Sequence, residues 1–391
     1  MHLDLIATST FGLEAVVKRE LEALGYPAAS TQTGRVEFSG DAAAVARTNL
    51  RLRTADRVLI RVGRFEASDF DTLFEAVREL PWEEWIGPED AFPVAGRSVK
   101  SVLSSVPAVQ RAVKKAIVDR LLSAHRVRQL PETGPTVAVE VALLKDTATI
   151  TLDTSGDGLH KRGYRDLTGP APLRETLAAA LVDLSFWKRG KPLVDPFCGS
   201  GTIAIEAAMI GRNIAPGLSR TFAAEDWPVL DESIWTRAHE EARDLELPDL
   251  GERISAGDID EKALSMARRH AARAGVAGDI HFQRRPFSEL SSARKYGCVV
   301  TNPPWGVRLE DRDDVRVLYE SMAEVFARLP TWSFFVLTPW PDFEQILGRR
   351  ADRRRKLYNA QIESTYFQFH GPRPSRLAAD ETPAETDPDE G

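Results

Sequence analysis

Residues 192–208, PLVDPFCGSGTIAIEAA, constrain the fold of this chain more than any other stretch. An apolar run ends at Asp195, a Gly-Ser-Gly turn follows, and the next segment is apolar and suited to a helix. A strand, a glycine-rich turn and a helix in this order form the first unit of a sheet built from parallel strands. The alternation returns at RISAGD, IHFQ and CVVTN. We therefore predict an α/β fold over residues 173–374, with a mostly parallel sheet and helices on both faces.

Residues 1–154 show a different pattern, with shorter elements of both kinds. Hydrophobic periodicity predicts strands at LDLIATS, GRVEFSG and RVLIRVGRF, and helices at LEAVVKRELEALG, DAAAVARTNLRL, DFDTLFEAVREL and VPAVQRAVKKAIVDRLL. Asp41 suits the N-cap position of the second helix, and a hairpin is expected to turn at Lys145 and its neighbour. We predict a small α+β region, with one unit over residues 1–52 and another over residues 53–154.

Two further segments complete the expected organisation. Glycines and prolines dominate residues 155–172, which predicts a linker between the two regions. Residues 375–391 carry six acids against one arginine and have no large apolar residue beyond Leu377. A segment of this composition cannot bury enough apolar surface to fold, so we expect a disordered acidic tail.

The composition excludes several classes of protein. No apolar run approaches the ~18 residues of a membrane span, and the first ten residues do not resemble a signal peptide. Two cysteines, Cys198 and Cys298, are too few for a disulfide framework or a cysteine-based zinc site. The seven histidines show no metal-ligand spacing. We therefore expect a cytoplasmic monomer with no metal and no membrane contact.

Basic residues are clustered although the formal net charge is −7. Between residues 97 and 128 eight lysines and arginines stand against one acid, Asp119, and a second cluster, HKRGYR, covers residues 160–165. Such residues often form an ordinary solvated helix face. Their density also suits contacts with RNA phosphates. The candidate RNA-binding residues are Arg97, Lys100, Arg111, Lys114, Lys115, Lys161, Arg162, Tyr164 and Arg165.

The glycine-rich turn suits a cofactor that carries an amino acid. Gly199 and Gly201 have no Cβ atom, so a ligand can approach the backbone closely, and the helix that follows offers free N–H groups. A dinucleotide site would require a third glycine, which is missing here. Asp195 before the turn would repel a pyrophosphate but would attract an ammonium group. The alternative is a structural tight turn in an α/β fold.

Asp258 ends the next strand and is placed to accept both hydroxyls of a ribose. Asp260, two residues on, suits the N-cap of the following helix. After the third strand, where an acid often meets the adenine amine, this chain has Pro286, which has no side-chain acceptor. Adenine recognition is therefore expected to use backbone carbonyls.

The stretch TNPPWGVRL follows the fourth strand. Its two prolines fix φ and remove N–H donors, so the corner presents acceptors, namely the Asn302 amide oxygen and the Pro303 carbonyl. Two acceptors satisfy both hydrogens of an exocyclic amine, and Trp305 offers a ring for stacking on a flipped base. A strand-ending turn with a buried tryptophan is the structural alternative.

Taken together, these motifs resemble those of class I S-adenosylmethionine-dependent methyltransferases that modify amino groups. DPFCGSGT resembles the cofactor loop, GDID the ribose-binding acid and NPPW the catalytic corner. SVPAVQRAVKKAIVDRL is similar to the RNA-binding helix of THUMP domains, and EAAMIGRNIAPGLSRTFAAEDW and RRRKLYNAQIESTYFQFHGP resemble the THUMP-containing guanine methyltransferases of 23S rRNA. The resemblance reaches to about residue 374.

This resemblance implies a ferredoxin-like domain over residues 1–52, a THUMP RNA-binding domain over residues 53–154, and a Rossmann-like domain that makes N(2)-methylguanine with S-adenosylmethionine. It implies cofactor contacts by Asp195, Pro196, Phe197, Gly199, Ser200, Gly201, Thr202, Asp258 and Ile259, and a catalytic corner of Asn302, Pro303, Pro304 and Trp305. Trp305 replaces the tyrosine that is common after NPP. The alternatives are a tRNA guanine methyltransferase and a non-catalytic RNA-binding factor of ribosome assembly.

Overall fold

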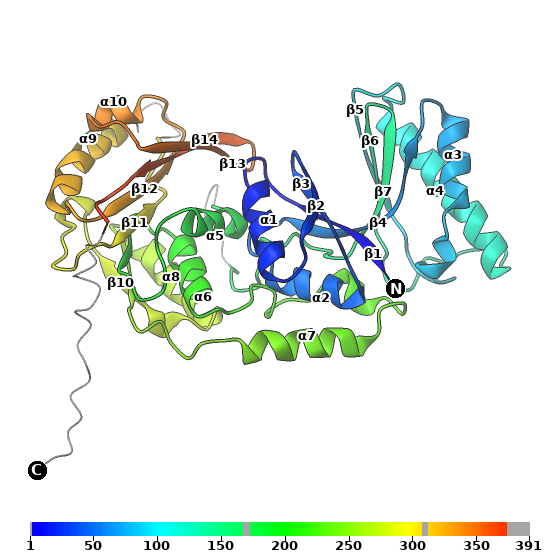
Figure 1. The fold of residues 1–391 in the computed structure, drawn as a ribbon, viewed down its shortest axis with the longest axis horizontal. Helices are drawn as coiled ribbons and strands as arrows, with labels where there is room; N and C mark the ends of the chain where they lie inside the picture. The colour runs from blue at the N-terminus through cyan, green and yellow to red at the C-terminus, as the bar shows by residue number, and fades with distance from the viewer. Residues whose placement is uncertain (1, 167–172, 307–311, 374–391) are drawn as a thin grey trace, which may run out of the picture.

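The computed structural model describes residues 2–166, 173–306 and 312–373. Within them the chain forms two seven-stranded sheets, each with helices packed against it (Figure 1). The expected acidic tail, residues 375–391, lies outside the described residues, as do residues 167–172 of the expected linker. No described helix combines the length and apolar character required to cross a membrane.

The N-terminal sheet has the strand order β2-β3-β1-β4-β7-β6-β5. Its strands are β1 (Leu3–Thr8), β2 (Ala28–Gln32), β3 (Arg35–Gly40), β4 (Arg57–Glu66), β5 (Val94–Val99), β6 (Val139–Leu144) and β7 (Thr147–Asp153). Its helices are α1 (Glu14–Ala23), α2 (Ala42–Arg51), α3 (Phe70–Glu79) and α4 (Val106–His125). The predicted elements are all present, and the apolar pattern did not indicate β2, a strand of small and polar residues.

Local signals in this region act as expected. Asp41 accepts a hydrogen bond from the Ala44 N–H and caps α2. Lys145 and Asp146 have positive φ values of 51° and 62°. Two such residues in succession make the hairpin turn whose twist matches that of the strands it joins, β6 and β7.

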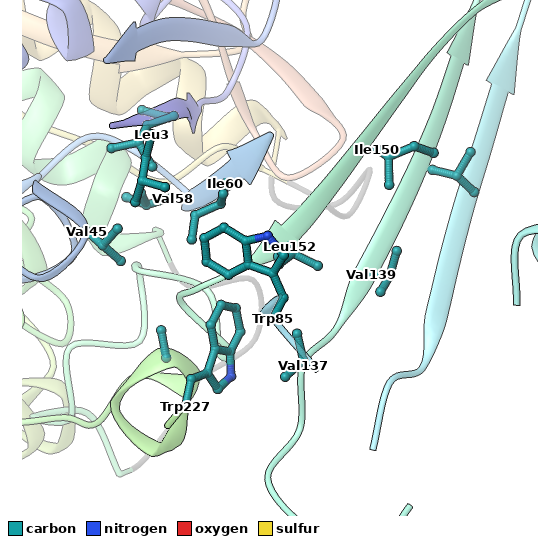
Figure 2. Close-up of a cluster of buried hydrophobic side chains, with 14 of the residues drawn as sticks. Leu3, Val45, Val58, Ile60, Trp85, Val137, Val139, Ile150, Leu152 and Trp227 are labelled. Atoms are coloured by element: carbon teal, nitrogen blue, oxygen red, sulfur yellow. The ribbon is translucent and has the colours of Figure 1, made fainter. Parts of the chain in front are cut away.

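Strand β4 joins the two N-terminal units into one sheet. Its first residues pair with β1, and most of the strand pairs with β7, with a bulge between Arg61 and Gly63. Val58 and Ile60 of β4 are buried in the same hydrophobic cluster as Leu152 of β7 (Figure 2). The units over residues 1–52 and 53–154 therefore share a sheet and a core.

The second sheet has the order β10-β9-β8-β11-β12-β14-β13. Its strands are β8 (Leu193–Asp195), β9 (Ile254–Asp258), β10 (Ile280–Arg284), β11 (Cys298–Thr301), β12 (Ser333–Thr338), β13 (Arg353–Asn359) and β14 (Ile362–Phe369). Its helices are α5 (Glu175–Asp183), α6 (Thr202–Gly211), α7 (Glu232–Asp244), α8 (Glu261–Arg273), α9 (Arg312–Arg328) and α10 (Phe343–Leu347). The five strands from β10 to β12 run parallel, and β14 is antiparallel to β12, so the mostly parallel α/β sheet is confirmed.

Alternate residues of the central strands enter two different cores. Leu193 and Val300 pack in a cluster with α5, α6 and α8, whereas Val194 and Val299 pack in a cluster with α9 and α10. The sheet is thus covered on both faces, and its ligand-binding crevice is expected at the carboxyl ends of the strands, where the strand order reverses at β8.

The segment between α6 and β9 ties the two halves of the molecule together. Its Phe222, Trp227 and Trp235 are buried in the N-terminal core, where Trp227 lies beside Trp85 (Figure 2). Helix α7 runs along α2 (Figure 1), and Glu241 of α7 pairs with Arg47 at 2.7 Å. These aromatic side chains are packing residues.

Candidate active site

A cavity of about 660 Å³ opens at the carboxyl ends of β8, β9, β10 and β11. The loops that follow the four strands form most of its wall, and α9 closes one side. The loops contribute Pro196, Phe197, Gly199, Asp258, Ile259, Pro286, Phe287, Ser288, Asn302, Pro303, Pro304 and Trp305. Nine of the thirteen residues predicted for cofactor binding and catalysis therefore meet in one cavity.

Asp258 is held rigidly at the mouth of the cavity. Its Oδ2 accepts the Gly199 N–H and its Oδ1 accepts the Asp260 N–H, both at 2.9 Å. Each carboxylate oxygen can accept more than one hydrogen bond, so both can also accept from a ligand hydroxyl. Asp260 accepts the Lys262 N–H at 2.8 Å and caps α8, which confirms its predicted role.

The glycine turn leaves open space at one glycine and none at the other. A Cβ atom on Gly199 would have no neighbour within 4 Å, although its φ of 50° disfavours a side chain. A Cβ atom on Gly201 would lie 3.0 Å from the Cβ atom of Ala267 on α8. Gly199 thus lets a ligand approach the backbone, whereas Gly201 lets α6 and α8 pack closely.

Asp195 lies behind the cavity wall. It is 1% exposed and accepts hydrogen bonds from the Thr301 hydroxyl at 2.7 Å and the Phe197 N–H at 3.3 Å. Burial raises the pKa of its carboxyl to about 7. The carboxylate was expected to meet a ligand ammonium, but the structure places it between the ends of β8 and β11, where it positions the two loops. Ser200, Gly201 and Thr202 likewise do not line the cavity.

The corner after β11 lines the cavity and holds two buried polar atoms without described partners. Asn302 Oδ1 is buried and accepts no hydrogen bond from any described residue. The indole N–H of Trp305 is also buried without a described acceptor, and its ring is half-buried against the core. A buried acceptor without a donor is costly, so this arrangement favours a ligand that brings N–H groups.

Two side chains outside the corner hold its backbone. The Tyr319 hydroxyl on α9 donates to the Pro304 carbonyl at 2.8 Å and also bonds the Thr338 hydroxyl at 2.9 Å. The Trp340 indole N–H donates to the Trp305 carbonyl at 2.8 Å. Because the two prolines have no N–H groups, the corner depends on donors that lie far away in the sequence.

Apolar side chains cover the region between the loops after β9 and β10. Phe287 stacks on Phe197 with ring centroids 5.0 Å apart, and the Ile259 side chain at the cavity is 65% exposed. Pro286 lines the cavity, and its carbonyl already accepts the Glu289 N–H. Ser288 also lines the cavity and supplies a side-chain hydroxyl there.

Comparison with known proteins identifies the chain. A family model described as the RMKL-like methyltransferase domain matches residues 162–368, which is more than half of the sequence. The chain belongs to the RMKL-like methyltransferases. A model of the RlmL ferredoxin-like domain matches residues 4–59 and a THUMP model matches residues 67–153, so both N-terminal domains that the resemblance implied are confirmed.

Relatives resemble this RMKL-like methyltransferase over nearly their whole length. YpsC from Bacillus subtilis (strain 168), whose name gives RNA methyltransferase as its expected activity, is 47% identical over 367 residues, 93% of this chain and 95% of its own. A Listeria monocytogenes (4b F2365) structure described as a predicted N6-adenine-specific DNA methylase is 48% identical, with a TM-score of 0.91, over 95% of this chain and 97% of its own. SMU.472, a methyltransferase crystallised with SAH, is 44% identical, with a TM-score of 0.90, over 96% of this chain and 99% of its own.

Two of the predicted RNA-binding residues of this methyltransferase are buried instead. Arg162 and Tyr164 are each 2% exposed, and both bind Glu206 of α6, which is 0% exposed. The Arg162 guanidinium lies 3.4 Å and the Tyr164 hydroxyl 3.1 Å from its carboxylate. They cannot contact RNA, because a buried carboxylate requires them as partners. Arg165 is nine-tenths buried and pairs with Glu175.

The other predicted RNA-binding residues lie at the surface. Arg97, Lys100, Arg111, Lys115 and Lys161 are exposed, and Lys114 is half-buried. Four of them pair with acids: Arg97 with Glu140, Lys114 with Glu132, Lys115 with Asp119 and Lys161 with Asp157. Their role in RNA binding stays a prediction.

Sequence patterns did not indicate the contribution of α9. Asp314, Val317, Leu318 and Ser321 line the cavity from this helix. Leu318 packs in the hydrophobic cluster beneath α9 and Val317 is exposed to the cavity, so the helical periodicity alone describes an ordinary amphipathic helix. No local motif marks its cavity-facing side.

Proposed function

We propose that the protein transfers a methyl group from S-adenosylmethionine to the exocyclic 2-amino group of a guanine in 23S rRNA. The observation that carries this proposal is that Asn302 lines the cavity and that its buried Oδ1 lacks a described donor. The methyltransferase and THUMP matches support an RNA substrate.

The residues present fit S-adenosylmethionine. Asp258 has free lone pairs for the two ribose hydroxyls, and Gly199 leaves space for close approach of the methionine part. Ile259 and Phe287 offer apolar surface to the adenine ring, and the Ser288 hydroxyl lies in the same wall. The relation to SMU.472, crystallised with SAH, supports this cofactor.

The catalytic role falls to the corner after β11. When bound, the cofactor supplies an electrophilic methyl group on a sulfonium centre. Asn302 Oδ1 and the Pro303 carbonyl accept the two N–H groups of the guanine amine, which turns its lone pair away from them. Trp305 offers its ring to the base, and stacking contributes ~1–3 kcal/mol per base. Positioning of this kind supplies most of the acceleration, and a strong general base is not required.

The decisive variant is Asn302→Ala. We expect loss of labelled methyl transfer to 23S rRNA by at least about 100-fold, a loss of the order found on removing one preorganised hydrogen-bonding group. SAH affinity, measured by calorimetry, is expected to stay within about twofold of wild type, because Asn302 faces the amine. Near-normal turnover of this variant would refute the mechanism.

The substrate is tested in a deletion strain. Mass spectrometry of 23S rRNA and tRNA is expected to show one N(2)-methylguanine missing from the rRNA and restored by the wild-type gene. A methylguanine missing from tRNA instead would assign the tRNA alternative. Complete absence of labelled transfer to either RNA by the pure protein would leave the non-catalytic alternative.

A further inference from the structure

A second cavity, of about 730 Å³, lies outside the proposed active site. Four segments that are distant in sequence form its walls: residues 157–165 after the THUMP domain, residues 174–175 at the start of α5, residues 220–221 before α7, and the turn between β13 and β14. The cavity therefore lies where the N-terminal half meets the methyltransferase domain.

Positive charge dominates this junction cavity. Five of the lining residues are lysine or arginine, against two acids, Asp157 and Glu175. The basic side chains are those of Lys161, Arg162, Arg165, Arg174 and Arg220. Burial lowers the pKa of His160, which also lines the cavity, to about 4, so its ring is neutral at pH 7.

Carboxylates neutralise only some of these cations. Arg162 and Arg165 pair with buried Glu206 and Glu175. Arg220 instead donates to five backbone carbonyls, with distances of 2.6 Å to Asp157 and 2.7 Å to Gly158, and forms no ion pair with a described residue. Its guanidinium is thus fixed in place by backbone carbonyls, and the Asp157 and Asp153 carboxylates act on its charge only from a distance.

Arg174 is available to an incoming ligand. Its guanidinium makes neither a hydrogen bond nor an ion pair with any described residue, although Asp56 lies near enough for its charge to act on it. Arg174 is also the N-cap residue of α5, so free N–H groups at the start of that helix add positive potential. Lys161 pairs with Asp157 at the surface, where exposed pairs contribute little.

The junction cavity is connected to the proposed active site by one side chain. Arg165 lines the cavity, and its guanidinium donates to the hydroxyl of Thr202, the first residue of α6. Thr202 lies directly after the glycine turn, and its hydroxyl also lies 3.3 Å from that of Ser200. An anion in the cavity would therefore lie close to the loop that the proposal assigns to the cofactor.

We propose that the junction cavity binds the phosphodiester backbone of the RNA substrate, with Arg174 and Lys161 as the phosphate contacts and Arg220 as a fixed positive charge. A rigid basic surface between the domains holds the RNA in register while the flipped guanine enters the active site. Phosphate contacts fix position and carry no sequence information. This inference rests on the proposed function for the identity of the RNA.

The test compares the Lys161→Ala/Arg174→Ala double variant with a control double variant, Lys188→Ala/Arg189→Ala. The control removes the same charge from the exposed segment beyond the other end of α5. Binding to a 23S rRNA fragment is measured by fluorescence anisotropy over a series of salt concentrations. Each phosphate contact contributes about 0.7 to 0.9 to the slope of log affinity against log salt.

We expect the slope of the Lys161→Ala/Arg174→Ala variant to fall by about 1.4 to 1.8 for two lost contacts, and its affinity near 0.1 M salt to fall about tenfold. Arg174→Lys is expected to keep most of the wild-type slope, and the control variant all of it. SAH affinity and melting temperature are expected to be unchanged. A wild-type slope in the Lys161→Ala/Arg174→Ala variant, or equal losses in the control, would overturn the inference.

A small anion could use the same chemistry. Inorganic triphosphate that binds through Arg174 while the RNA slope stays unchanged would assign a small-anion site and contradict the inference. Wild-type protein that binds no rRNA fragment would also contradict it. Failure of the proposed function gives a different result: wild-type protein binds RNA with a slope that depends on Arg174, yet transfers no methyl group to it.

Discussion

The buried carboxyl of Asp195 predicts an unusual dependence of stability on pH. Its pKa is raised by burial from the ordinary value of 3.8 to about 7, and the nearby Asp258 carboxylate raises it slightly further, against the hydrogen bonds from Thr301 and Phe197. The folded protein therefore holds a proton at pH values where the unfolded chain has lost it. A raised carboxyl pKa means that the stabilising contribution is complete below pH 3.8 and is lost as pH rises to about 7.

The size of the effect follows from the shift. The two pKa values differ by about three units, and each unit corresponds to 1.36 kcal/mol, so ionisation of this group removes about 4 kcal/mol of unfolding free energy. The loss is spread over the range from about pH 4 to pH 7 and stops above it. Asp195 is 1% exposed, so solvent screening does not reduce the figure appreciably.

Asp195→Asn removes the titrating group and keeps its size. The measurement is the denaturant midpoint of wild type and variant from pH 4.5 to 8.5, since the difference between them cancels the other titrating groups. We expect the variant to be less stable than wild type at low pH. As pH rises to about 7, its free energy of unfolding is expected to increase relative to that of wild type by about 1.4 kcal/mol per pH unit.

A second variant tests the physical cause. The Thr301 hydroxyl donates to Asp195 and so lowers its pKa. Thr301→Val removes this donor. We therefore expect the pH range over which wild type loses stability to extend to higher pH in this variant. A difference between wild type and Asp195→Asn that does not change with pH would refute the reasoning, because it would show that the buried carboxyl does not titrate in this range.

Three further variants test other contacts. Tyr319→Phe removes the donor to the Pro304 carbonyl. We expect kcat for methyl transfer to fall about tenfold, which corresponds to about 1.4 kcal/mol, while SAH binding measured by calorimetry stays unchanged. Reduced SAH binding with a normal kcat would contradict this. Arg162→Leu leaves the buried Glu206 carboxylate without its ion-pair partner. We expect the free energy of unfolding, measured by chemical denaturation, to fall by about 3–5 kcal/mol. Normal stability together with weakened RNA binding would instead indicate that Arg162 contacts RNA. Trp227→Ala opens a cavity in the shared core. We expect it to lower the free energy of unfolding by about 3–5 kcal/mol, seen as a lower melting temperature of the N-terminal region. A change below about 1 kcal/mol would show that this region is stable without the packing of the segment between α6 and β9.

Much of the candidate site followed from short stretches of sequence. Asp258 and Asn302 each end a strand, and the carboxyl ends of parallel strands meet at one edge of a sheet. Their convergence on one cavity could therefore be predicted although 44 residues separate them in the chain. Gly199 and the cap at Asp260 are equally local, because each depends on backbone geometry within a few residues.

The sequence misled where burial decides the role of a residue. HKRGYR is a basic cluster by composition, and nothing within it reveals that Arg162 and Tyr164 point inward. Their partner, Glu206, stands more than forty residues later on α6, in an apolar run where a single acid gives no indication of its neighbours. The burial of Asp195 could likewise not be read from the sequence, since Thr301 binds it from another strand.

By itself, the sequence determined the type and order of the elements, the parallel sheet, and the residues that end its strands, because hydrophobic period, turn glycines and caps act over a few residues. The tertiary structure alone decided which polar groups are paired and which stay available. Asn302 Oδ1 and Arg174 are without described partners, whereas Arg162 and Tyr164 have theirs. A charge or acceptor has a function only through the groups around it, and those groups come from distant parts of the chain that only the folded packing brings together.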